Sequence, residues 1–135
     1  MQPDLNTPIE TMGEALATNN KLEVLIMREN KIKWVHYCNF WNLILTNTTL
    51  LKMNLQKTDL SDRVVEKMGK YLEQPNVSLV DLDISKNQIT DAGLKTLCAS
   101  LKINQTIKFL NLSGNKIKDD GLNDLVDVLN DNKTL

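Results

Sequence analysis

His36 and Cys38 are the residues whose types and spacing could support chemistry in this sequence. His36 is the single histidine, and Cys38 is one of two cysteines. A histidine beside a cysteine could activate a thiolate nucleophile, and both side chains are common metal ligands. However, the apolar spacing around them predicts a helix, on which residues two apart diverge by about 200°. We therefore expect neither a shared proton nor a shared metal, and we assign His36 a structural role.

Other residue types that could act chemically have simpler explanations. The five glycines form neither a dinucleotide-binding nor a phosphate-loop motif. Asp119 and Asp120 are adjacent at the expected start of a helix, where acidic side chains stabilise the helix dipole. The five methionines are scattered through apolar positions and the first helix, where packing explains them. The sequence therefore predicts no enzyme, no cofactor and no metal site.

The charge balance narrows the class of partner. The 16 basic and 17 acidic residues are interspersed and give a net charge of -1, which argues against a nucleic-acid or anionic-membrane surface. The first residues lack the pattern of a secretory signal, and no apolar run reaches membrane-spanning length. Cys38 and Cys98 fall in helices two units apart, too far for a disulfide. We expect an intracellular, cytoplasmic protein with one or more protein partners.

The elements that position these residues repeat along the chain. Residues 79–106 and 107–134 are near copies, with apolar residues, an asparagine and a Gly-Leu pair at matching places. The asparagine position recurs as Asn30, Thr58, Asn87 and Asn115, at intervals of 28, 29 and 28 residues. Each unit begins with period-two alternation, which predicts a strand, and continues with an apolar stripe at helical spacing. Such units bury their apolar faces only by stacking, which gives a parallel sheet.

The pattern L-x-x-L-x-L-x-x-N-x-I resembles leucine-rich repeats of the ribonuclease-inhibitor type over about residues 9–135. The resemblance implies an α/β leucine-rich repeat solenoid, with a curved parallel sheet on the concave face, helices on the convex face, and protein binding as its main use. It makes Asn30, Asn87 and Asn115 the structural asparagines of the turns. Thr58 departs from the pattern, which puts its turn in doubt.

The chain divides into a cap and four repeats. Thr7, Pro8 and Glu10 form a helix start signal, so we expect residues 1–21 to hold a cap helix, from residue 8 to about 18, and a return loop. The repeats cover residues 22–49, 50–78, 79–106 and 107–134. Leu135 opens a further repeat that is truncated, so we expect a fragment of a longer chain or a partner that covers this end.

The concave face offers one candidate binding surface. Its outward strand positions are Val24, Ile26, Arg28, Lys52, Asn54, Gln56, Asp81, Asp83, Ser85, Phe109, Asn111 and Ser113. Ile26 and Phe109 could anchor a partner, Asp81 and Asp83 could receive basic side chains, and Arg28 is a further strand-face candidate. An ordinary solvated strand face is the alternative.

The first repeat helix offers a second candidate surface. Tyr37 and Phe40 align with its core stripe, which leaves Trp34, Cys38, Trp41 and Leu45 as another apolar stripe on the convex side, spaced by four, three and four. A helix with two apolar faces is buried on both. Three explanations remain open at this point: a protein partner covers the stripe, residues 1–7 or the cap helix fold over it, or the helix register is shifted.

These features favour a noncatalytic protein-interaction module that serves as a scaffold or adaptor in a larger intracellular assembly. One alternative is a regulator of an enzyme, because the repeats are also similar to those of the Ran GTPase-activating protein, whose activity needs an exposed arginine. Another alternative is a structural component associated with the cytoskeleton. Its basis is the return loops, which look like those of actin-capping tropomodulins and of ciliary regulatory proteins.

Overall fold

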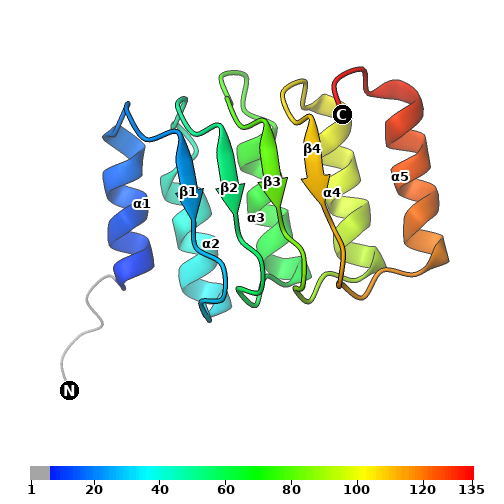
Figure 1. The fold of residues 1–135 in the computed structure, drawn as a ribbon, viewed down its shortest axis with the longest axis horizontal. Helices are drawn as coiled ribbons and strands as arrows, with labels where there is room; N and C mark the ends of the chain where they lie inside the picture. The colour runs from blue at the N-terminus through cyan, green and yellow to red at the C-terminus, as the bar shows by residue number, and fades with distance from the viewer. Residues whose placement is uncertain (1–6) are drawn as a thin grey trace.

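In a computed structural model, residues 7–135 fold into alternating helices and short strands (Figure 1). The elements in chain order are α1 (Pro8–Thr18), β1 (Val24–Ile26), α2 (Trp34–Leu43), β2 (Lys52–Asn54), α3 (Asp62–Leu72), β3 (Asp81–Asp83), α4 (Asp91–Ile103), β4 (Phe109–Asn111) and α5 (Asp119–Asp131). The strands form one layer and the helices form a second layer behind it. The fold is therefore an α/β solenoid, as the repeat predicts.

The four strands form one parallel sheet in the order β1-β2-β3-β4. The repeat sets their register, because Leu25, Met53, Leu82 and Leu110 pair in sequence across the sheet. The middle residue of each strand points toward the helices, and the residues on either side point outward. Strands of three residues cannot stand alone, so each one depends on its neighbours and on the helix behind it.

The core lies between the two layers. Met53, Leu82, Leu94 and Leu97 are fully buried there. The first apolar position of the second, third and fourth repeats follows the same rule at Leu50, Leu79 and Ile107, which are also fully buried. Each unit thus contributes aliphatic side chains to a continuous core, which no unit could build by itself.

Asn87 closes the turn after β3 and joins it to the preceding unit. Its Nδ2 donates to the carbonyl oxygens of Leu55, Ile84 and Ser85, each at 3.0 Å. Its Oδ1 accepts from the backbone N–H groups of Thr58 and Leu60 at 2.9 and 3.0 Å. A buried amide can meet both needs because it carries a donor and an acceptor.

The turn at Thr58 forms even though threonine replaces the asparagine of the repeat pattern there. Its hydroxyl donates to the Leu55 carbonyl oxygen at 2.8 Å, so the turn retains one closing hydrogen bond. The Tyr37 hydroxyl lies 2.9 Å from the same Oγ1, and both side chains are fully buried. Burial raises the pKa of Tyr37 well above its ordinary value of 10.0, so this phenol stays protonated. The Tyr37 hydroxyl therefore takes part in the hydrogen bonding that an asparagine amide provides in the other turns.

A second asparagine series fixes the return loops from helix to strand. Asn104 donates from Nδ2 to the Leu72 carbonyl oxygen at 3.0 Å, and its Oδ1 accepts from the N–H groups of Thr106 and Ile107. Asn47 and Asn132 likewise donate from Nδ2 to a carbonyl oxygen of the helix in the preceding unit. These asparagines are buried, so a structural role explains their recurrence.

Gly93 lets α4 approach the preceding unit. The carboxylate of Asp62, the first residue of α3, accepts from the N–H of Thr90 at 2.9 Å and from its hydroxyl. A Cβ at Gly93 would overlap that carboxylate. Gly121 and Asp91 repeat the arrangement one unit later, where Asp91 accepts from the N–H of Lys118 at 2.7 Å. The repeated glycine is thus explained by contact with the adjoining unit.

Candidate protein-interaction surfaces

The outward side chains of the four strands form two rows across the sheet, which we call the sheet face. One row consists of Val24, Lys52, Asp81 and Phe109, and the other of Ile26, Asn54, Asp83 and Asn111. Ile26 is 60% exposed and Phe109 is 63% exposed. The structure therefore places large apolar side chains at both ends of the sheet face, with polar side chains between them.

The centre of the sheet face carries the two carboxylates of Asp81 and Asp83. Lys52 Nζ lies 3.6 Å from Asp81 Oδ2, and this is the one ion pair at the sheet face among residues 7–135. Asp83 instead accepts from the Ser85 N–H at 3.0 Å and from the Asn111 amide at 3.4 Å. Neutral donors orient the Asp83 carboxylate without cancelling its charge, so it can attract a cation.

A hollow of about 500 Å³ lies beside these carboxylates. It is lined by Lys52, Asn54, Asp81, Asp83, Lys108, Phe109, Leu110 and Asn111. Of the sequence-predicted residues, it brings together Asp81, Asp83 and Phe109. Ile26 lies on β1, next to the lining residue Asn54, and Arg28 is exposed beyond the end of β1. The two residues therefore lie outside this hollow.

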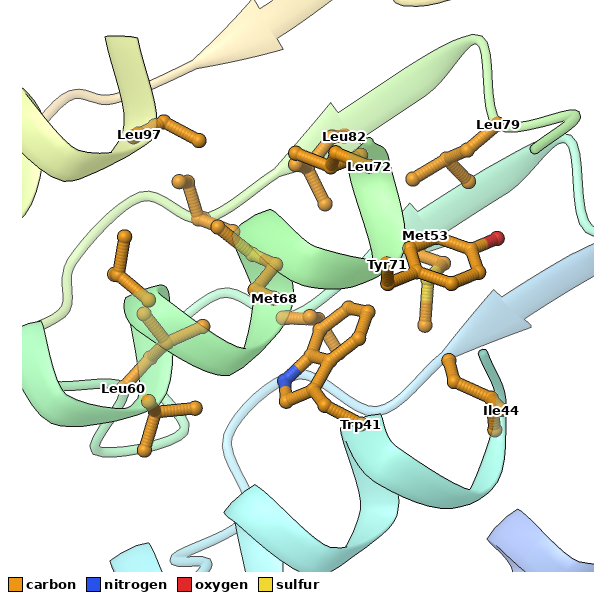
Figure 2. Close-up of a cluster of buried hydrophobic side chains, with 14 of the residues drawn as sticks. Trp41, Ile44, Met53, Leu60, Met68, Tyr71, Leu72, Leu79, Leu82 and Leu97 are labelled. Atoms are coloured by element: carbon orange, nitrogen blue, oxygen red, sulfur yellow. The ribbon is translucent and has the colours of Figure 1, made fainter. Parts of the chain in front are cut away.

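The apolar stripe on α2 does not need a partner, so that prediction was wrong for Trp41 and Cys38. Trp41 is fully buried, and its ring centroid lies 5.4 Å from that of Tyr71 on α3. Figure 2 shows the indole beside Tyr71 and Met68. Cys38 is also buried, with its Sγ 3.9 Å from the Arg63 carbonyl oxygen. The neighbouring repeat helix covers the stripe, a possibility outside the three explanations considered.

The residues at the two ends of the apolar stripe are less buried than those at its centre. Trp34 is 50% exposed, and the Arg63 guanidinium lies 4.2 Å from its ring centroid. This cation–π contact covers part of the indole. Leu45 is partly buried and packs against the core. Trp34 is therefore the one member of the stripe that keeps a large exposed apolar surface.

A signal for this arrangement was present in the sequence. The residues that align with Trp41 in the following helices are Gly69, Cys98 and Val126, all small or apolar. Gly69 and Cys98 are buried between helices, whereas Val126 is exposed on α5. In α2, α3 and α4 this position faces the next helix. Sequence reasoning missed Tyr71 because it compared positions within helices and not contacts between them.

His36 forms a polar cluster with α1. Glu10 Oε1 lies 2.9 Å from His36 Nδ1 and accepts from the Asn39 amide at 2.8 Å. Glu10 Oε2 accepts from the Thr7 N–H at 3.3 Å. The hydrogen bonds from Asn39 and His36 lower the pKa of Glu10 below its ordinary value of 4.5. The cluster joins α1 to α2, which fits the structural role expected of His36.

The two thiols are protected. Cys38 and Cys98 are free and buried. Burial raises the pKa of both thiols, and that of Cys98 rises to about 11. Across residues 7–135 no three metal-ligating side chains are grouped to hold an ion. In the same residues no helix has the length and apolarity needed to cross a bilayer.

Comparison with known proteins agrees with this geometry. The profile of the family described as "Leucine Rich repeat" matches residues 76–98 and 104–126. Each match covers a strand and the first part of the helix that follows it. The chain has the fold of a leucine-rich repeat solenoid, and residues 76–98 and 104–126 match the repeat itself.

One relative of the solenoid is NACHT, LRR and PYD domains-containing protein 14 of Mus musculus. The two are 31% identical over 103 residues, which is 76% of this chain and 10% of the relative. The solenoid therefore spans about a tenth of the length of that protein.

Two solved structures have similar folds. The solenoid matches Leiomodin-1 Actin-Binding Site 2 with a TM-score of 0.82 and 18% identity, over 99% of this chain and 78% of the other. It matches the Caenorhabditis elegans tropomodulin C-terminal domain with a TM-score of 0.83 and 17% identity, over 96% of this chain and 80% of the other. At these identities the matches establish the fold.

Proposed function

We propose that the solenoid is a noncatalytic protein-interaction module that binds its partner through the sheet face, as a scaffold or adaptor in a larger intracellular assembly. The observation that carries this proposal is the pairing of exposed Phe109 with the oriented carboxylates of Asp81 and Asp83 around one hollow. In this complex the partner packs an apolar group against the Phe109 ring and pairs a basic side chain with Asp83.

Physical reasoning supports this choice of face. Aromatic side chains contribute a large share of binding energy where a partner excludes water from them. The Phe109 ring is largely exposed, yet its strand is fixed in the sheet, so little conformational entropy is lost on binding. A rigid sheet that presents side chains in register is also a more accurate scaffold than a set of loops.

Affinity capture from the native source, followed by mass spectrometry, tests the proposal. Phe109→Ser and Asp83→Asn should each reduce recovery of the partner, because one removes the apolar anchor and the other removes the charge. The matched control is Ile103→Ser, since Ile103 is 58% exposed at the end of α4, away from the sheet face. Equal recovery of the same proteins by Phe109→Ser and the unaltered chain would refute the role of the sheet face.

A cytoskeletal partner is the second candidate. The name of one structural neighbour assigns it an actin-binding site, and that match covers 99% of this chain. We infer that this solenoid could associate with actin filaments or with axonemes. Co-sedimentation with purified actin filaments, and separately with axonemes, tests the idea. If the chain stays in the supernatant at saturating filament concentrations, the cytoskeletal function is excluded.

We further propose that the repeats are of the ribonuclease-inhibitor type and that the protein is cytoplasmic. The 28 to 29 residue period supports the subtype, as do convex-side helices of 10 to 13 residues in every repeat. We also propose that residues 1–21 form a cap and that four repeats occupy residues 22–49, 50–78, 79–106 and 107–134. Localisation of the tagged full-length protein would test the compartment.

A further inference from the structure

The helix layer of the solenoid extends one element beyond the sheet layer at the N-terminal end of the described residues. Residues 7–135 contain five helices but four strands. Each of α2 to α5 follows a strand of its own repeat, and β1 is the end strand of the sheet (Figure 1). Among residues 7–135, no strand pairs with the edge of β1 that faces away from β2.

The open edge of β1 carries backbone groups that can pair. Met27 N–H donates to the Asn54 carbonyl oxygen at 2.9 Å, and the Glu23 carbonyl oxygen accepts from the Lys52 N–H at 3.0 Å. These bonds, made by the residues that flank β1, show that the odd-numbered residues from 23 to 27 direct their backbone groups toward β2. Successive residues of a strand alternate in this direction, so Val24 and Ile26 direct theirs to the open edge. An added strand could pair with both.

An apolar pocket lies beside this edge. It has a volume of about 560 Å³ and is lined by Thr7, Pro8, Ile9, Met12, Met27, Asn30, Lys31, Ile32, Lys33 and His36. Inside the solenoid, each unit instead supplies two fully buried aliphatic side chains five residues apart: Leu55 with Leu60, and Ile84 with Ile89. An incoming segment with the same spacing would fill the pocket.

Asn30 presents a hydrogen-bond acceptor to the pocket. Its Nδ2 donates to the Met27 carbonyl oxygen at 2.8 Å, as in the later turns. The corresponding Oδ1 of Asn87 accepts two N–H groups of the preceding unit, and that of Asn115 accepts the Ile89 N–H at 3.1 Å. Within the part of the chain that the structure describes, Asn30 Oδ1 accepts no hydrogen bond. It is placed to accept from the backbone of an added segment.

The basic side chains at the rim of the pocket favour an acidic residue in the incoming segment. Lys31 and Lys33 line it, and the lining contains no carboxylate. In parallel, in-register pairing, the segment residue one before the second aliphatic side chain lies next to Lys31, because Lys31 itself precedes Ile32. An acidic residue there would pair with the lysine.

We propose that β1, α1 and the pocket between them bind an extended segment of a partner protein, which adds as a parallel fifth strand. The segment carries aliphatic residues at positions i and i+5 and an acidic residue at i+4. Strand addition to an exposed sheet edge is a general mode of peptide recognition. This site lies at the edge of the sheet, so it extends the proposed function, which concerns the sheet face.

A synthetic peptide with the sequence of residues 51–62, LKMNLQKTDLSD, is a suitable probe because Leu55, Leu60 and Asp59 have the required spacing. With a fluorescent label on the peptide, anisotropy measured against the intact chain should show saturable binding. A control peptide with Leu55→Ser and Leu60→Ser should bind at least tenfold more weakly, since it cannot fill the pocket.

Two protein variants separate edge pairing from nonspecific adhesion. Val24→Pro removes an outward N–H from the edge and should weaken binding about fivefold. Lys31→Glu should weaken binding of the same peptide about threefold, and a peptide with Asp59→Lys should bind this variant better than it binds the unaltered chain. Circular dichroism confirms that each variant is folded. Phe109→Ser should leave peptide binding unchanged, so failure of the sheet face and failure of the edge site are distinguishable.

The proposal is overturned if the intact chain does not bind the peptide, or if Lys31→Glu and Asp59→Lys show no charge compensation. It is also overturned if binding occurs only after residues 1–6 are removed. In that case the N-terminal segment of the chain itself occupies the pocket, and no partner is needed.

Discussion

The indole of Trp41 and the phenol of Tyr71 pack across the boundary between α2 and α3, with ring centroids 5.4 Å apart and an interplanar angle of 48°. Trp41 also contacts the Phe40 ring at 5.5 Å in an edge-on geometry. Neither Trp41 Nε1 nor Tyr71 Oη has a hydrogen-bond partner among the described residues. Apolar packing therefore accounts for the contact between these two helices.

Trp41→Ala should lower the free energy of unfolding by about 3–5 kcal/mol, because it removes a fully buried aromatic side chain and leaves a cavity. Urea denaturation followed by circular dichroism measures the change. Trp34→Ala is the matched control and should cost about 1 kcal/mol or less, since that indole is half exposed and loses mainly a cation–π contact. Equal losses for the two variants would contradict the packing described for α2.

Gly93→Ala should destabilise the protein by about 1–2 kcal/mol, although alanine favours helices over glycine by about 1 kcal/mol. The reason is that the new Cβ displaces the Asp62 carboxylate from the Thr90 N–H. In an Asp62→Ala background the same substitution should be neutral or stabilising. Thermal unfolding of the four variants gives the coupling energy, and additive effects would show that Asp62 does not explain the glycine.

Glu10→Gln should weaken the dependence of stability on pH in the acid range. Hydrogen bonds from Asn39 and His36 lower the pKa of Glu10 in the folded protein below its ordinary value of 4.5. Its contribution is therefore complete above pH 4.5 and is lost as the pH falls through the lowered pKa. Unfolding measured between neutral and acid pH should show a smaller loss for Glu10→Gln than for the unaltered chain, and parallel curves would refute the assignment.

Cys98 should react slowly with a disulfide reagent such as dithionitrobenzoate at neutral pH. Burial restricts access of the reagent, and a thiol whose pKa is raised to about 11 holds little of the reactive thiolate. Cys38→Ser isolates the reaction of Cys98, and the same variant in denaturant gives the unprotected rate. A folded rate within tenfold of the denatured rate would show that α4 opens readily.

The regular parts of the fold were predictable because they depend on residue spacing. The asparagine series predicted the turn at Asn87, and the start signal at Thr7, Pro8 and Glu10 predicted the start of α1. The hollow beside Phe109 was predictable only in part. Strand alternation placed Asp81 and Phe109 on one face, but the sequence could not show that Lys52 pairs with Asp81 and leaves Asp83 free to attract a cation.

The sequence by itself determined the repeat, the alternation of strand and helix, and the residues that face the core, because these follow from the periods of 2 and 3.6 residues within each unit. Only the tertiary structure decided how neighbouring units meet. It buried Trp41 against Tyr71, placed Asp62 over Gly93, and made β1 an end strand of the sheet within residues 7–135. Contacts between units depend on the distance and angle between helices, and no period within one unit specifies those quantities.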